Sequence, residues 1–184
     1  VSGPGTITDS TVTITGGGVI AVRAFQEGNA SFNPAEATLN ITVNRAAGTI
    51  ALSNLAFVYD GSPKPATVTT TPLGLNNSVT YNNSAALPVN AGSYAVSATI
   101  TSPNYQGSAD STLVISKASQ VISILPVPNK SFNDVPFFVN ASTSSGLPLT
   151  YSMVTVPASG VAVLNGNIIT LSGGGGTVTV TVSQ

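Results

Sequence analysis

Apolar and polar residues alternate along many short stretches of the chain. The clearest stretch is Thr177–Val182, in which every second residue is Val. A second one begins at Ser93, where Tyr94, Val96, Ala98 and Ile100 fall on one face and polar or small residues on the other. A period of two is the pattern of a β-strand with one buried face. We therefore predict an all-β protein.

The same reasoning places strands along three segments that Gly-, Pro- and Asn-containing turns divide. In residues 1–47, Ile20, Val22 and Ala24 are expected to face inward and to leave Arg23 in water. The predicted strands of that segment are Thr11–Thr15, Val19–Phe25 and Leu39–Val43. Those of residues 48–118 are Ile50–Leu52, Phe57–Tyr59, Ala66–Thr71, Val79–Tyr81, Tyr94–Thr101 and Leu113–Ile115. Those of residues 119–184 are Val121–Ile124, Phe137–Ala141, Leu149–Val154, Ile168–Leu171 and Thr177–Val182.

Two internal matches indicate tandem repeats. The run from Val43 to Leu52 matches the run from Ile115 to Ile124 without a gap, with a basic residue and Ala at each junction. The Gly run that precedes Thr177–Val182 also parallels Gly16–Gly18, so that Val178, Val180 and Val182 correspond to Ile20, Val22 and Ala24. Residues 1–47 therefore read as the back half of a unit whose front half resembles residues 119–171. We interpret the chain as a window from a longer array.

Residues 48–118 resemble the MBG domain, a "mostly bacterial Ig-like" module. The resemblance rests on spaced motifs that occur in the family's order: Phe57-x-Tyr59-Asp60-Gly61-x-x-Lys64, Val89-x-Ala91-Gly92-x-Tyr94-x-Val96, Ser102-Pro103-Asn104-Tyr105-x-Gly107 and Lys117-Ala118. The flanks resemble related Ig-like repeats, through Gln26-x-Gly28-Asn29-x-x-Phe32 and through Ser145–Ser152.

The resemblance implies tandem seven-stranded Ig-like β-sandwiches, one complete and two partial, arranged end to end. Residues 1–47 would be the C-terminal half of a repeat, residues 48–118 a complete MBG-type domain, and residues 119–184 a repeat that lacks its last strand. The resemblance implies no catalytic residue and fixes no ligand.

Charged residues make up 6% of the chain, against about 25% in an average soluble protein. Hydroxyl and amide side chains must therefore provide the solubility. The chain contains no cluster of Lys and Arg that could neutralise phosphates, so we expect neither nucleic-acid binding nor polybasic membrane attachment. No apolar run approaches the roughly 20 residues of a membrane helix, and we expect no membrane insertion in this segment.

The chain has no His and no Cys, which removes the usual nucleophile–base pairs and most transition-metal sites. None of its six carboxylates lies within four residues of another, and no calcium-loop motif is present. Asp60 and Asp134 lie in turns, where we expect an Asx-turn role. We therefore predict no enzyme, no catalytic residue, no cofactor and no metal site.

The Lys and aromatic residues offer two further kinds of side-chain chemistry. Lys64, Lys117 and Lys130 raise the alternative of a Lys–Asn isopeptide cross-link, which needs a buried Lys, an Asn and an assisting acid; an exposed role at the junction suits Lys117 better. The five Tyr could form a sugar platform, but Trp is absent and core packing is the better interpretation of Tyr94. Phe137 and Phe138 fall on opposite faces of one strand, so one of them is expected to be exposed.

These observations favour a structural repeat segment, either a stalk or spacer or a part of an appendage, of a very large bacterial cell-surface or secreted adhesin-like protein. The alternative is an adhesive module that binds a glycan or a protein through its loops. The expected partners are neighbouring Ig-like repeats of the same chain and, through strand pairing, a further copy in a homo-oligomer. We expect an extracellular location on the bacterial cell surface.

Overall fold

A computed structural model of the chain describes residues 1–156 and 160–184. These residues contain strands and turns but no helix, and hence no helix that could span a membrane. The prediction of an all-β protein is confirmed. The chain divides into two compact units, Val1–Ala118 and Ser119–Gln184. How the units are placed end to end stays a prediction.

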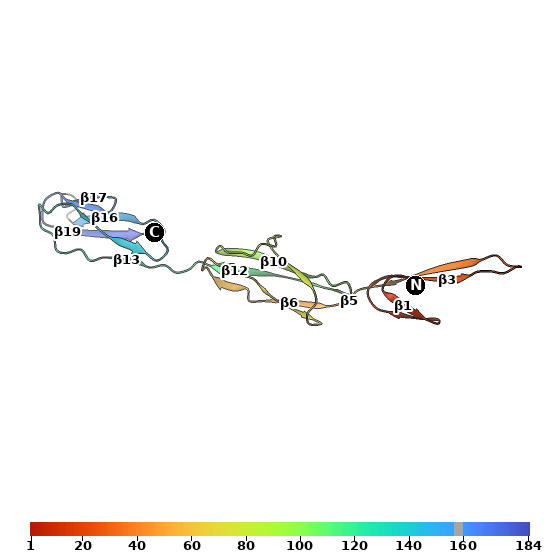
Figure 1. The fold of residues 1–184 in the computed structure, drawn as a ribbon. Helices are drawn as coiled ribbons and strands as arrows, with labels where there is room; N and C mark the ends of the chain where they lie inside the picture. Colours follow the sequence, from red (N-terminus) through yellow and green to blue (C-terminus); the bar gives the residue numbers. More distant parts are fainter. Residues whose placement is uncertain (157–159) are drawn as a thin grey trace. The chain divides into compact units, whose positions relative to one another are not determined.

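Residues 48–118 form seven strands, six of which make up two layers, while β11 lies in neither layer. One layer is a four-stranded sheet in the order β7-β12-β10-β9, and the other is the pair β6-β8 (Figure 1). Strands β10 and β12 are the longest of this segment and pair antiparallel, from Gly92 opposite Ile115 to Thr99 opposite Ser108. The bounds are β6 Thr49–Ser53, β7 Ala56–Val58, β8 Thr67–Thr71, β9 Asn77–Tyr81, β10 Gly92–Ile100, β11 Tyr105–Gln106 and β12 Ser108–Ser116.

The core of this segment comes from the alternating faces of β10 and β12. Val96, Ala98 and Ile100 are at most 3% exposed, as the sequence pattern predicts, and Leu113 and Ile115 on β12 are equally buried. Tyr81 completes one cluster with Val96, Leu113 and Ile115, while Ile50 of the other layer packs with Ala98 and Ile100. Tyr94 is only half-buried, because its hydroxyl donates a hydrogen bond to the carbonyl of Asn90 at the edge of the core.

A tight turn follows β9, where the sequence predicts one. Asn82 and Asn83 both have positive φ, 48° and 64°, and Tyr81 and Ser84 exchange backbone hydrogen bonds across them. Asn tolerates this left-handed region better than most residues with a side chain. The turn ends the sheet at that corner and leaves β9 as its edge strand.

Residues 1–47 form two antiparallel hairpins, β1 Gly5–Thr8 with β2 Thr11–Ile14 and β3 Gly18–Gln26 with β4 Ala35–Val43 (Figure 1). Strand β5, Ala46–Ala47, then pairs in parallel with β11. Of the three residues expected to face inward, Ile20 is fully buried, Val22 is half-buried and Ala24 is exposed. The expectation for Ala24 was wrong, because the outer part of the β3–β4 hairpin has no second layer over it among the described residues.

The β3–β4 hairpin carries an exposed ion pair. Arg23 Nη2 lies 2.5 Å from Glu36 Oε2, both side chains are 57% exposed, and the Arg23 guanidinium lies 4.9 Å from the centroid of the Phe25 ring. We expect Glu36→Gln to change the free energy of unfolding by less than about 1 kcal/mol, because water screens an exposed pair. Thermal unfolding followed by circular dichroism measures this. A larger loss would mean that the hairpin depends on the pair.

The described residues of the second unit form three small sheets, β13-β15, β14-β18-β17 and β16-β19. Few of these residues are buried, namely Val139, Val161 and Ile169. The sequence predicted Phe137–Ala141 as one strand, but the structure divides it into β14 and β15, since Val139 donates its N–H to Asn167 and leaves the ladder. Phe138 is 57% exposed and Phe137 is half-buried, as the alternation predicts. The bounds are β13 Ile122–Ile124, β14 Phe137–Phe138, β15 Ala141–Thr143, β16 Thr150–Val156, β17 Ala162–Asn165, β18 Ile168–Leu171 and β19 Thr177–Ser183.

Candidate functional site

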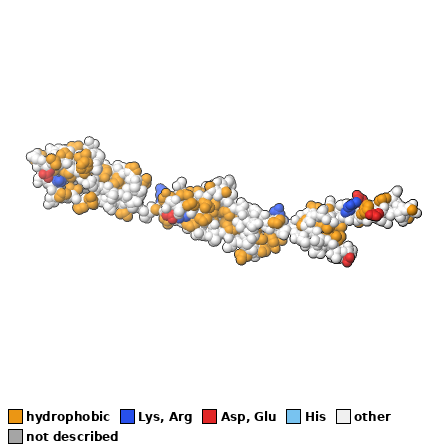
Figure 2. All heavy atoms as spheres, in the orientation of Figure 1, with side chains coloured by type: hydrophobic (Ala, Val, Ile, Leu, Met, Phe, Trp, Pro, Cys, Tyr) orange, Lys and Arg blue, Asp and Glu red, His pale blue; other side chains and the backbone are white. Residues whose placement is uncertain are grey.

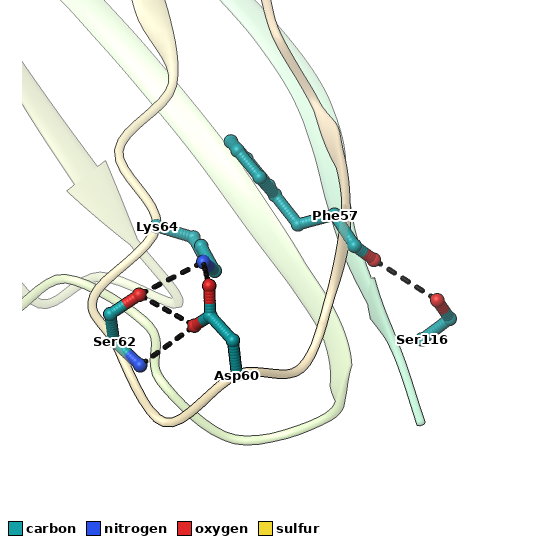
Figure 3. A network of polar contacts seen from close by, with 5 residues as sticks. All are labelled: Phe57, Asp60, Ser62, Lys64 and Ser116. Carbon is teal, nitrogen blue, oxygen red and sulfur yellow. Dashed lines mark hydrogen bonds and ion pairs between the residues drawn. The ribbon is translucent and has the colours of Figure 1, made fainter. Parts of the chain in front are cut away.

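The Tyr59-Asp60-Gly61-x-x-Lys64 motif forms a closed turn after β7 (Figure 3). Asp60 Oδ1 accepts hydrogen bonds from the backbone N–H of Ser62 at 2.9 Å and from its hydroxyl at 2.5 Å. Lys64 Nζ lies 2.5 Å from Asp60 Oδ2 and 3.0 Å from Ser62 Oγ. Gly61, with φ at 81°, lets the chain reverse between the partners. The expected Asx-turn role of Asp60 is thereby confirmed.

The two partners of this ion pair differ in exposure. The Lys64 side chain is 11% exposed and the Asp60 side chain 57%. The ammonium also lies 5.6 Å from the centroid of the Phe57 ring, whose backbone carbonyl accepts a hydrogen bond from Ser116 Oγ (Figure 3). The hydrogen bond from Lys64, and then those from Ser62, hold the pKa of Asp60 well below its usual range. The carboxylate therefore stays ionised and keeps the buried ammonium paired.

The contacts of this cluster are those of an ion pair that holds a turn closed. An isopeptide bond would need an Asn beside the buried Lys, and the polar partners of Lys64 Nζ are Asp60 and Ser62. An ionised carboxylate is also a poor acceptor for nucleophilic attack by an amine. Lys117 is exposed, and Lys130 is exposed with its Nζ 4.7 Å from the Phe137 ring centroid.

The remaining carboxylates of the described residues do not cluster into a metal site. Within residues 1–156 and 160–184, no group of three or more His, Cys, Asp or Glu side chains could hold a metal ion. Asp134 was predicted to form an Asx-turn, but its carboxylate accepts the N–H of Ser131, three residues earlier, and so closes a turn that precedes it. Figure 2 shows charged side chains only in small scattered groups on the face drawn.

The Ser102-Pro103-Asn104-Tyr105-x-Gly107 motif joins residues 48–118 to the segment before them. The Asn104 side-chain oxygen accepts the N–H of Gly17 at 3.0 Å, and its backbone carbonyl accepts the N–H of Ala46 at 2.8 Å. Gly48 donates its N–H to the Gln106 carbonyl at 2.9 Å. Ser102, which is 8% exposed, accepts the N–H of Asn104 and so orients the loop. The sequence marked this motif only as part of a resemblance, because nothing in its pattern shows that β11 would pair with β5.

Gly107 allows the closest backbone approach at this junction. A Cβ atom there would lie 2.3 Å from the Gly48 carbonyl oxygen, which is backbone and cannot turn aside. We expect Gly107→Ala to cost about 1–3 kcal/mol of unfolding free energy, as overpacking does elsewhere. Gly175→Ala is the matched control, because nothing lies within 4 Å of its Cβ position. Urea unfolding measures how much stability each variant loses relative to the wild-type chain. Equal losses would show that the backbone at the junction shifts to accept a Cβ atom.

Comparison with known families finds one match, and it covers the segment that holds both motifs. Residues 48–119 match the family model of the MBG domain. MBG domains are non-enzymatic Ig-like modules, typical of surface and extracellular proteins. No curated protein and no solved structure is significantly similar to the chain. The turn of Asp60 and the junction loop of Asn104 lie within the segment that is similar to the MBG domain, and the flanking segments lie outside the match.

Proposed function

We propose that the chain is a structural repeat segment, a stalk, spacer or appendage-building part, of a very large bacterial cell-surface or secreted adhesin-like protein. In this proposal the segment has no enzymatic activity and lies outside the cell. Its partners are the neighbouring Ig-like repeats of the same chain. The MBG match supports this class, since such modules are typical of surface proteins.

One observation carries the proposal most directly: the junction at Asn104. A spacer must hold each repeat in a fixed orientation relative to the repeat before it. A flexible linker would not keep that orientation. Here the linker Arg45–Gly48 is bonded through Ala46 and Gly48 to the loop 102–107, and Asn104 also reaches Gly17. The polar groups of the loop 102–107 thus form hydrogen bonds within the chain itself.

The polar surface of the MBG domain also suits a spacer. Ser and Thr on the outer faces of β10 and β12, together with a low content of charge, give a surface without a strong electrostatic field. Protein-binding surfaces are enriched in aromatic side chains, Met and Arg. Of the five Tyr residues, Tyr81 is buried and Tyr94, Tyr105 and Tyr151 are half-buried, while Tyr59 is 41% exposed. A single exposed ring favours core packing over a sugar platform.

Small-angle scattering of the whole chain tests the spacer geometry. A compact globule of this length would have a radius of gyration of about 16 Å. We expect a clearly larger value and a distance distribution with a long tail, because both linkers are short and the linker 45–48 is hydrogen-bonded through Ala46 and Gly48. A scattering curve that fits a sphere would contradict the spacer.

A glycan array tests the competing adhesive function. We expect no signal above that of an unrelated β-protein of similar charge. If the chain gave a signal, and substitutions in the loops abolished it without loss of the fold, the adhesive function would be supported and the spacer function contradicted.

A further inference from the structure

The loop 102–107 of the MBG domain lies against a glycine turn of the preceding segment, Gly16–Gly18. Asn104 uses three of its polar groups at this junction. Its side-chain Oδ1 accepts the N–H of Gly17, its carbonyl accepts the N–H of Ala46, and its own N–H is donated to Ser102 Oγ at 3.3 Å. The side-chain contact of Asn104 is therefore made to the backbone of the preceding segment.

The glycine turn is held in place by its own hairpins. Thr15, directly before the turn, donates its N–H to the Pro4 carbonyl at 2.9 Å. The Pro4 ring also lies 3.2 Å from the position that a Cβ atom of Gly18 would take. Strand β3 then begins at Gly18. Because both ends of the turn are fixed in this way, the preceding segment presents the Gly17 N–H as a preformed donor.

A side chain at position 16 would take the place of the Asn104 oxygen. A Cβ atom on Gly16 would lie 2.5 Å from Asn104 Oδ1. The Asn104 side chain can rotate away from this contact, but the rotation breaks its hydrogen bond to Gly17. Gly16 does not have a positive φ, so Ala at this position strains no backbone dihedral. Position 16 therefore discriminates between Gly and other residues through the hydrogen bond of Asn104.

Position 17 is enclosed on two sides. A Cβ atom on Gly17 would lie 3.2 Å from the Pro103 carbonyl oxygen and 3.3 Å from Arg45 Cγ. Pro103 belongs to the loop and Arg45 to the linker, which the parallel pair of β5 and β11 holds together. A side chain at position 17 would push the turn away from both. The junction thus fits two consecutive glycines.

We propose that the loop 102–107 recognises the preceding repeat by its Gly-Gly turn, and that Asn104 determines this specificity. The proposal rests on the spacer function and names the repeats that can stand before this MBG domain, namely those with two consecutive glycines after a β-hairpin. The second unit has the same arrangement. Its hairpin β17–β18 is followed by Ser172, which donates its N–H to Val161 as Thr15 does to Pro4, and then by Gly173–Gly176.

Amide hydrogen exchange of the full chain, followed by NMR, tests this recognition. We expect the Gly17 N–H to exchange at least about fivefold faster in Asn104→Ala than in the wild-type chain, which is the effect of one net hydrogen bond. Gly16→Ala should accelerate Gly17 by a similar factor. In the Asn104→Ala background the same substitution has no hydrogen bond to break, so it should add less than about twofold.

Asn104→Asp is the matched control, because a carboxylate oxygen at the same place still accepts an N–H, and the Gly17 N–H should stay protected. Gly92→Ala controls for the added methyl group, since its Cβ atom would lie 3.6 Å from the nearest atom, on Tyr94. The amides of β10 report in each variant that the MBG domain is folded.

Equal exchange of Gly17 in the wild-type chain and Asn104→Ala would overturn the proposal. An effect of Gly16→Ala that is as large in the Asn104→Ala background as in the wild-type chain would also overturn it. The spacer function is tested separately, since scattering of an extended chain would support it whatever the exchange of Gly17. A spherical scattering curve would contradict the spacer and leave the exchange result unchanged.

Discussion

Leu113→Ala is expected to lower the free energy of unfolding of the MBG domain by about 2–5 kcal/mol. Leu113 is 0% exposed at the centre of β12 and packs in one cluster with Tyr81, Val96 and Ile115. Truncation removes apolar contacts and leaves a cavity between two sheets that cannot collapse freely. Urea unfolding of the full chain, followed through the amide NMR signals of β10, measures the loss.

The neighbour on the same strand supplies the control. Val114 is 44% exposed on the outer face, so Val114→Ala removes little buried surface and should cost well under half as much. If both variants unfolded at the same urea concentration, the two-layer core described here would be wrong. The comparison isolates burial from strand propensity, because both substitutions place Ala in β12.

Asp60→Asn is expected to destabilise the MBG domain at neutral pH more than Lys64→Met. The substitution at position 60 leaves a buried ammonium facing a neutral amide, whereas the substitution at position 64 leaves only an exposed carboxylate in water. Met also keeps the apolar stem against Phe57. The double variant should therefore be more stable than Asp60→Asn alone. Thermal unfolding ranks the three variants by stability. If Lys64→Met were less stable than Asp60→Asn, the structural role of the ion pair would be contradicted.

The same pair predicts how stability changes with acid. The pKa of Asp60 is lowered in the folded state, so its contribution is fully present above the pKa of an unfolded aspartate, about 3.9, and disappears as the pH falls toward the lower folded value. The wild-type chain should lose stability across this acidic window more steeply than Asp60→Asn does. Parallel curves for the wild-type chain and Asp60→Asn would contradict the lowered pKa of Asp60.

The strands with strict alternation could be predicted from the sequence, because the pattern itself records which face is buried. Strands β10 and β19 are of this kind, and Val96, Ala98 and Ile100 lie where the pattern places them. Of β12, Ser108–Ser116, the sequence predicted only Leu113–Ile115. The two-residue strands β5 and β11 could not be predicted, since a parallel pair that short has no period. Strand β1, Gly5–Thr8, was missed for a related reason: it carries one apolar side chain and is otherwise Gly and Thr.

The candidate site was predictable only in part. The turn at Asp60 follows from Asp-Gly chemistry, but the burial of Lys64 does not, because it depends on Phe57 and on the Pro88 carbonyl that accepts the Lys64 N–H. The inward role expected of Ala24 failed because a period of two tells which residues share a face and not whether anything covers that face. Covering depends on elements far away in the sequence.

The parallel pairing of β7 with β12 has a consequence for tension along the chain. Val114, Ile115 and Ser116 lie beside Ala56, Phe57 and Val58, and the chain enters the MBG domain ahead of β7 and leaves it after β12. A pull on the two ends therefore slides these strands past each other in shear. Their hydrogen bonds, including those from Val114 to Leu55 and from Tyr59 to Ser116, must then break together rather than one after another. The domain is built to resist stretching most strongly along the direction in which its chain runs.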